Sequence, residues 1–201
     1  MRVDNPLSAR ELLQIFRFAD DPFNRWDAMQ SLYDWCIGEI EQGAVIPDTV
    51  WDYLREVLHD EKANHELLGE CLSVPSFETL CQSRSQINVK ALCAAREAFC
   101  QQFADALHDG LIAVWQAIET TDYVYDQRNV NARRCKNVVL GHLARTSHGT
   151  SLIRAQYDSA DNMTDALASL KAAQICDGEL FSDLMTRFGE RWEKEPLVLD
   201  K

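Results

Sequence analysis

The sequence predicts an all-α fold: an irregular stack of antiparallel helix pairs, of α-solenoid or bundle type, with about nine or ten helices. Three observations support this prediction. Only 8 glycines and 5 prolines occur among 201 residues, so few residues interrupt helices. Apolar residues recur at helical spacing from one end of the chain to the other. No stretch alternates apolar and polar residues over about five positions, as a half-buried strand would.

Helix start signals divide the first half of the chain. Ser8-Ala-Arg-Glu11 is a capping box, and apolar residues at helical spacing follow it. Asp21 and Pro22 suit an N-cap and a first helical position, and the helix that they open is expected to stop at Gly43. Further helices are predicted to open at Ile46-Pro47-Asp48 and to cover residues 59–72 and 76–82.

The second half begins with the longest periodic stretch, residues 89–119, which Asn88 caps. Gly110 favours a break or kink inside that stretch. The links between helices are short, and no low-complexity linker occurs, so we expect a single helical domain over residues 1–201. The helices vary in length, which argues against a consensus repeat array and leaves an irregular solenoid open. The later helices are predicted over residues 129–144, 150–157, 164–174 and 178–192.

The composition excludes several classes of partner. The formal net charge of −12 repels phosphate backbones and anionic lipid, so we expect neither nucleic acid nor a membrane surface as a partner. No stretch approaches the run of about eighteen apolar residues that a membrane span needs, and residues 1–10 do not resemble a secretory signal.

The seven cysteines predict free thiols. Their number is odd and no pair has C-x-x-C spacing, which gives no support to a zinc site or a disulfide framework. Most of them occupy apolar helix positions, including Cys93 and Cys100 on one helix face. Buried thiols in a reducing compartment, the cytoplasm, are the interpretation that we adopt. The cysteines stand at positions 36, 71, 81, 93, 100, 135 and 176.

One short motif invites a metal interpretation. His65-Glu66-Leu67-Leu68-Gly69 begins like the H-E-x-x-H helix of zinc peptidases, in which two imidazoles four positions apart meet one ion. Gly69 carries no ligand atom, so this motif is expected to be an ordinary helix segment. The remaining histidines, at 59, 108, 142 and 148, are scattered, and the spacing of His108 and His142 does not show whether these two approach each other in space. We therefore predict no catalytic, cofactor-binding or metal-binding residue.

A basic cluster interrupts the acidic background. It is either a docking surface for an acidic partner or a neighbouring domain, or a helix face whose cations pair with surrounding carboxylates. The five tryptophans lie on apolar helical faces and are expected to pack between helices. The cluster consists of Arg128, Arg133, Arg134 and Lys136.

Three stretches, in the same order and at similar separations, resemble the C-terminal helical domain of the bacterial aminopeptidase N family. Pro22-Phe-Asn-Arg-Trp-Asp-Ala-Met-Gln-Ser-Leu32 is similar to its F-x-R-W-D-A-x-Q-x-L helix. Asp161-Asn-Met-Thr-Asp-Ala-Leu-Ala-Ser-Leu170 resembles N-N-M-T-D-A-L-A-x-L, and Arg191-Trp-Glu-Lys-Glu-Pro-Leu-Val-Leu-Asp-Lys201 resembles W-x-x-x-x-L-V-x-D-K-W. The residues themselves suggest structural roles: Asn162 or Thr164 as helix caps, and Arg25 and Asp27 beside Trp26.

The resemblance implies a parent enzyme that is a zinc-dependent aminopeptidase, with its metal and substrate-amine motifs in an upstream catalytic domain. This chain is then expected to be a non-catalytic fragment, without a zinc site of its own, that ends before the family domain does. Its partner would be the catalytic domain of the same polypeptide, on which it caps the cavity that peptides enter. The alternatives are a free-standing helical interaction module or, less in keeping with the residues, a self-sufficient enzyme. Apolar faces that have lost their neighbours would favour self-association.

Overall fold

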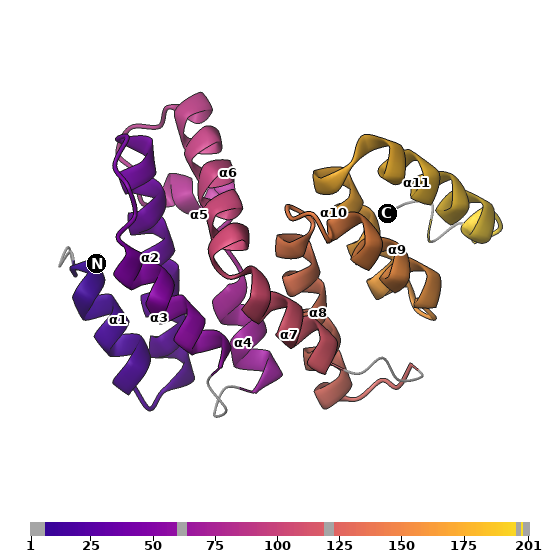
Figure 1. The fold of residues 1–201 in the computed structure, drawn as a ribbon, viewed down its shortest axis with the longest axis horizontal. Helices are drawn as coiled ribbons and strands as arrows, with labels where there is room; N and C mark the ends of the chain where they lie inside the picture. The colour runs from indigo at the N-terminus through magenta and orange to yellow at the C-terminus, as the bar shows by residue number, and fades with distance from the viewer. Residues whose placement is uncertain (1–6, 60–63, 119–122, 196–197, 199–201) are drawn as a thin grey trace. The chain divides into compact units, whose positions relative to one another are not determined.

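The computed structural model describes residues 7–59, 64–118, 123–195 and 198. Over these residues the chain forms eleven α-helices and no strand, which confirms the predicted all-α class (Figure 1). The chain divides into two compact units, Met1–Leu107 and His108–Lys201. We call them unit 1 and unit 2 and describe each by itself. The single domain expected over residues 1–201 stays a prediction.

Unit 1 contains six helices, and unit 2 contains five. The helices of unit 1 are α1 (Ala9–Phe18), α2 (Pro22–Glu41), α3 (Asp48–Leu58), α4 (His65–Leu72), α5 (Phe77–Gln82) and α6 (Val89–Ala106). The helices of unit 2 are α7 (His108–Ala117), α8 (Gln127–Leu143), α9 (Gly149–Ser159), α10 (Met163–Cys176) and α11 (Gly178–Trp192).

The helix starts are local features, and the predicted caps are present. The Ser8 hydroxyl accepts the Glu11 backbone N–H while the Glu11 carboxylate accepts the Ser8 N–H, so the capping box is complete. Asp21 accepts the Phe23 N–H in front of the N1 proline. Similar side-chain caps start most of the other helices: Asn64, Ser76, Asn88, Asp126, Asn162 and Asp177.

The long stretch after Asn88 is interrupted, but not at Gly110. Helix α6 ends at Ala106, Leu107 is its C-cap, and Gly110 lies inside α7. The Arg55 Nε–H donates to the Ala106 carbonyl oxygen at 3.1 Å, an acceptor that residue 110 would use in a continuous helix. A side chain from α3 thus caps the end of α6. This division into two helices explains why eleven helices form where about nine or ten were expected.

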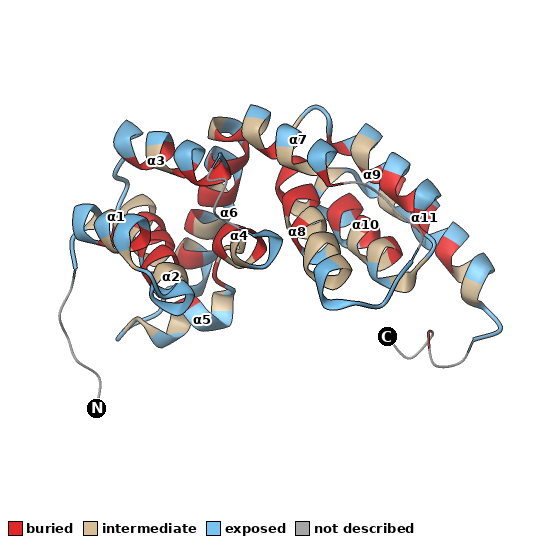
Figure 2. Ribbon diagram, turned by 90° about the horizontal axis from the view of Figure 1, so that it is seen from below, coloured by how far each residue is buried: buried red, intermediate tan, exposed pale blue. Residues whose placement is uncertain are grey.

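The core of unit 1 centres on aromatic rings between α2, α3 and α6. Tyr33, Phe99 and Phe103 are fully buried, with ring centroids 5.4–5.9 Å apart, and the Trp51 ring stacks on Phe99 at 5.9 Å. The Tyr33 hydroxyl donates to the Cys71 carbonyl oxygen at 2.7 Å, so this buried hydroxyl is satisfied. Figure 2 shows the buried sides of α2 and α6 in red.

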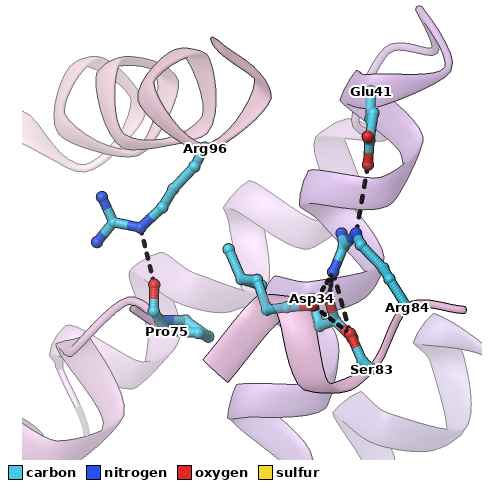
Figure 3. Close-up of polar contacts among 7 residues, drawn as sticks. Asp34, Glu41, Pro75, Ser83, Arg84 and Arg96 are labelled. Atoms are coloured by element: carbon cyan, nitrogen blue, oxygen red, sulfur yellow. Dashed lines mark hydrogen bonds and ion pairs between the residues drawn. The ribbon is translucent and has the colours of Figure 1, made fainter. Parts of the chain in front are cut away.

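Arginine side chains fasten the edges of unit 1. Arg84, which follows α5, donates from one nitrogen to Asp34 at 2.7 Å and from Nε to Glu41 at 3.3 Å, so it ties the end of α5 to α2 (Figure 3). Arg96 of α6 donates to the Pro75 carbonyl oxygen at 2.8 Å. The Arg84 side chain is only 14% exposed, so its two ion pairs are less screened than surface pairs.

The core of unit 2 lies between α8, α9, α10 and α11. Leu140, Ile153 and Leu184 are fully buried, and the Tyr157 hydroxyl donates to the Leu184 carbonyl oxygen at 3.2 Å. The turn from α8 to α9 is tight: a Cβ on Gly149 would lie 2.8 Å from the Ala144 carbonyl oxygen. Only glycine therefore allows this approach of the two backbones.

All seven cysteines are free, as predicted. Burial raises the pKa of Cys36, Cys71 and Cys135 to about 12, which keeps these thiols protonated at neutral pH. The expectation that Cys93 shares a buried face with Cys100 is wrong: Cys100 is buried, but Cys93 is exposed. Cys93 lies in the first turns of α6, a part of the helix in which other side chains are exposed too.

Candidate functional site

A groove in unit 2 is a candidate binding surface. It has a volume of about 640 Å³, and helices α8 and α10 form its two walls. Its floor is apolar, and three cationic side chains, Arg133, Arg134 and Lys171, stand along it. The remaining lining residues are Tyr123, Tyr125, Val130, Asn137, Val138, Gly141, Thr164, Leu167, Ala168, Ala172 and Ile175.

A polar network holds the two walls together. The Asn162 side chain caps α10 by accepting the Asp165 N–H at 3.0 Å and donates to the Asp165 carboxylate at 2.8 Å. Asn137 of α8 donates to the same carboxylate at 2.9 Å, and Gln156 of α9 donates to Asn137 at 2.7 Å. Helices α8, α9 and α10 are therefore joined by one chain of hydrogen bonds, which runs from Gln156 through Asn137 to the Asp165 carboxylate. The segment that resembles N-N-M-T-D has a structural role here.

The segment before α8 is anchored at the end of the groove. The Tyr123 N–H donates to the Asp161 carboxylate at 2.7 Å, and hydrogen bonds from the Asn162 side chain and from this amide lower the pKa of Asp161. The Arg133 guanidinium lies over the Tyr123 ring at 4.7 Å and donates to the Val124 carbonyl oxygen at 3.3 Å. Both contacts set the position of Tyr123 beside the cationic wall.

The basic cluster that the sequence suggested is split by the structure. Arg133 and Arg134 line the groove, and Arg128 lies in the exposed first turn of α8. Lys136 is half-buried instead: its Nζ donates to the Ile118 carbonyl oxygen at 2.9 Å and lies 4.6 Å from the centre of the Trp115 ring. Burial lowers the pKa of Lys136. Lys171 of α10, which the sequence analysis did not single out, takes its place in the groove.

The structure pairs two histidines that their sequence spacing does not connect. His108 pairs with His148 rather than with His142: its Nε2 lies 3.0 Å from the His148 Nδ1, and its Nδ1 lies 2.8 Å from an Asp109 carboxylate oxygen. His142 is buried on α8. Over the described residues, no group of three or more His, Cys, Asp or Glu side chains is placed to hold a metal ion.

Two other predicted positions have structural roles. His65 is the first residue of α4, and Gly69, where a zinc helix would carry its second imidazole, is buried. Arg25, which the sequence places beside Trp26, contacts α1 in the structure. Its guanidinium lies 4.6 Å from the centre of the Phe16 ring and its Nε donates to the Phe16 carbonyl oxygen, because the turn after α1 returns α2 along α1.

The five tryptophans are buried to different depths, and Trp51, Trp115 and Trp192 pack against other residues of the cores. Trp51 is buried, and the other four are partly buried.

Within the part of the chain that the structure describes, no helix is long and apolar enough to cross a membrane.

Over the described residues the fold is all-helical, and the groove between α8 and α10 is a candidate binding surface. Residues 9–201 match the family described as "Domain of unknown function (DUF3458_C) ARM repeats", and the chain belongs to that family. Over its whole length it is also similar to the C-terminal part of bacterial aminopeptidase N, which confirms the resemblance found in the sequence.

The relatives are much longer than this chain. The chain is 31% identical over 211 residues to aminopeptidase N of Haemophilus influenzae and 32% identical over 209 residues to aminopeptidase N of Escherichia coli. In both cases the match covers 100% of this chain but 24% of the relative. The crystal structure of Legionella pneumophila aminopeptidase A in complex with aspartic acid shares the fold, with a TM-score of 0.81, 20% identity, and coverage of 94% of this chain and 24% of that one.

Proposed function

We propose that residues 1–201 are a non-catalytic part of an aminopeptidase N, and that in the parent enzyme they cap the active-site cavity and limit which peptides reach it. The observation that carries this proposal is the coverage: the whole chain matches, yet it corresponds to about a quarter of each relative. A piece of that size, built only of helices over the described residues, suits a domain that shapes access to a site elsewhere.

The zinc ion of the parent enzyme belongs, in this proposal, to the catalytic portion outside residues 1–201. The His65–Gly69 motif does not fit such an ion, since Gly69 stands where the second imidazole of the H-E-x-x-H helix is needed. The proposed compartment is the cytoplasm, and the seven free thiols support it because a reducing environment keeps thiols unpaired.

The non-catalytic role is tested with the purified chain. Aminoacyl-anilide substrates in the presence of zinc should show no turnover above background. Turnover that a chelator abolishes would contradict the proposal. The gene sequence supplies an independent test. An H-E-x-x-H motif encoded upstream in the same reading frame would support the proposal that this chain is part of a larger enzyme. A stop codon after Lys201 and a promoter before Met1 would support a free-standing interaction module instead.

The capping role needs the parent enzyme. Deleting the segment that corresponds to residues 1–201 should raise kcat/KM for long peptides relative to that for a dipeptide anilide, because a wider entrance admits bulkier substrates. The zinc content of the two proteins, measured by atomic absorption, should be the same, which shows that the catalytic portion is intact. An unchanged ratio of long to short substrates at equal zinc content would refute the capping role.

A further inference from the structure

The groove between α8 and α10 has a local charge opposite to that of the whole chain. The chain carries 32 acidic and 20 basic residues, yet the described residues that line the groove include Arg133, Arg134 and Lys171 and no Asp or Glu. Two described carboxylates directly follow lining residues in sequence, Asp126 and Asp165, and both already accept hydrogen bonds at the starts of α8 and α10: Asp126 from Asn129, and Asp165 from Asn137 and Asn162. A groove of this kind attracts carboxylates while the rest of the surface repels them.

The same groove exposes apolar anchors. Tyr125 is 83% exposed, Tyr123 47% and Ile175 45%, so aromatic and aliphatic surface remains in water beside the cations. Tyrosine and arginine are the residue types that contribute most at protein interfaces. The wall of α8 is also open at Gly141, where a Cβ would meet no atom within 4 Å, so a bound chain can approach the α8 backbone there.

We propose that this groove seats a polypeptide segment that carries both apolar side chains and carboxylates, and that the segment belongs to the same polypeptide, outside residues 1–201. The choice of source rests on the proposed function. The relatives place about three quarters of their length outside the matched region, so such a segment would be tethered to the groove. Tethering supplies an effective concentration in about the millimolar range, which suffices for an open groove with few anchors.

The chemistry of the groove is tested on the chain itself. The probe is a short fluorescein-labelled peptide in which Leu and Phe alternate with Glu, and its partner peptide has Gln in place of Glu. Fluorescence polarisation should show at least about tenfold weaker binding of the Gln peptide. Lys171→Glu and Gly141→Leu should each weaken binding of the Glu peptide by about tenfold, through reversed charge and through a filled groove.

Matched variants elsewhere control for general effects. Lys90→Glu changes an exposed lysine of α6, and Gly38→Leu adds a side chain to α2 where a Cβ also meets no atom within 4 Å. Both should bind the Glu peptide like the unmodified chain. Equal binding of the Glu and Gln peptides, or Gly141→Leu binding like Gly38→Leu, would overturn the proposal whatever the parent enzyme does.

The source of the segment is tested in the full-length polypeptide. Tyr125 is replaced by the photo-crosslinker p-benzoylphenylalanine, and the crosslinked peptides are identified by mass spectrometry. Crosslinks within one chain to an acidic segment outside residues 1–201, reduced several-fold by Lys171→Glu, support the proposal. Crosslinks only to a second copy, only within residues 1–201, or none at all would overturn it. A reading frame that encodes only residues 1–201 would refute the proposed function. The peptide measurements would still test whether the groove binds acidic, apolar segments.

Discussion

Two glycines in unit 2 allow the packing of α8 against α9 to be tested with one methyl group. At Gly149 an added Cβ would lie 2.8 Å from the Ala144 carbonyl oxygen, 3.0 Å from the Ala144 Cα and 3.0 Å from the Leu143 carbonyl oxygen. These are backbone atoms, so they do not move aside as the end of a flexible side chain would. At Gly141, in the interior of α8, a Cβ would meet nothing within 4 Å.

The two substitutions are therefore expected to change stability in opposite directions. Overpacking of this kind costs about 1–3 kcal/mol. The gain in helix propensity, at most about 1 kcal/mol, offsets part of it, so Gly149→Ala should lower the free energy of unfolding by about 1–2 kcal/mol. Gly141→Ala gains the propensity term without a clash and should raise the free energy by about 0.5–1 kcal/mol.

Urea unfolding followed by circular dichroism at 222 nm measures both effects. The midpoints should move apart, and thermal midpoints should shift by about 2–4 °C for each kcal/mol in a chain of this size. Hydrogen exchange of the α9 amides should be faster in Gly149→Ala and unchanged in Gly141→Ala. If Gly149→Ala proved as stable as the unmodified chain while Gly141→Ala gained stability, the close approach of the α8–α9 turn would be disproved.

Four further predictions concern other polar and titratable groups. Replacing Arg84 by Ala leaves two part-buried carboxylates of α2 without their cation and should lower the free energy of unfolding in urea by about 2 kcal/mol. A cationic residue at this position should restore that stability, whereas Met, a side chain of similar length without charge, should not. Asn162→Ala removes the α10 cap and should cost about 1–2 kcal/mol, and Asn162→Asp should recover little of it, because the new carboxylate would face those of Asp161 and Asp165. Burial raises the pKa of the Cys36, Cys71 and Cys135 thiols in the folded state. Their contribution to stability is therefore complete below the unfolded pKa near 9 and is lost as pH rises toward 12. The free energy of unfolding should fall over that pH range, and it should fall less steeply when these thiols are replaced by Ala. At pH 8 a thiol reagent should modify Cys93 first, and fast modification of all seven sites would contradict the buried positions.

The features that sequence predicted well are those that neighbouring residues determine. The capping box at Ser8 and the caps at Asp21 and Asn88 depend on hydrogen bonds between residues two or three positions apart. Helical periodicity also depends on residues within about one turn of each other. The absence of strand patterns likewise follows from local spacing. Fold class and most helix starts were therefore accessible before any tertiary contact was known.

The features that sequence missed depend on partners far along the chain. The break after Ala106 involves Arg55, which lies 51 positions away, so Gly110 was a reasonable but wrong place to expect it. His148 is 40 positions from His108, and no spacing rule connects them. Arg25 reaches back nine positions to Phe16 across the α1–α2 turn, a contact that adjacency to Trp26 concealed.

The groove shows how a net charge can mislead about a local surface. The overall value of −12 predicts repulsion of phosphate backbones, because long-range repulsion sums over the charges of the whole chain. Docking of a peptide depends instead on charges within about one Debye length, roughly 8–10 Å. Arg133 and Arg134 are neighbours in sequence, so the sequence shows that they lie close together. Lys171 lies near them only because α10 packs against α8, a packing that includes the hydrogen bond between Asn137 and Asp165. The sign of the local field is thus a property of the helix pairing, and disrupting that pairing should abolish recognition of carboxylates even with every cation retained.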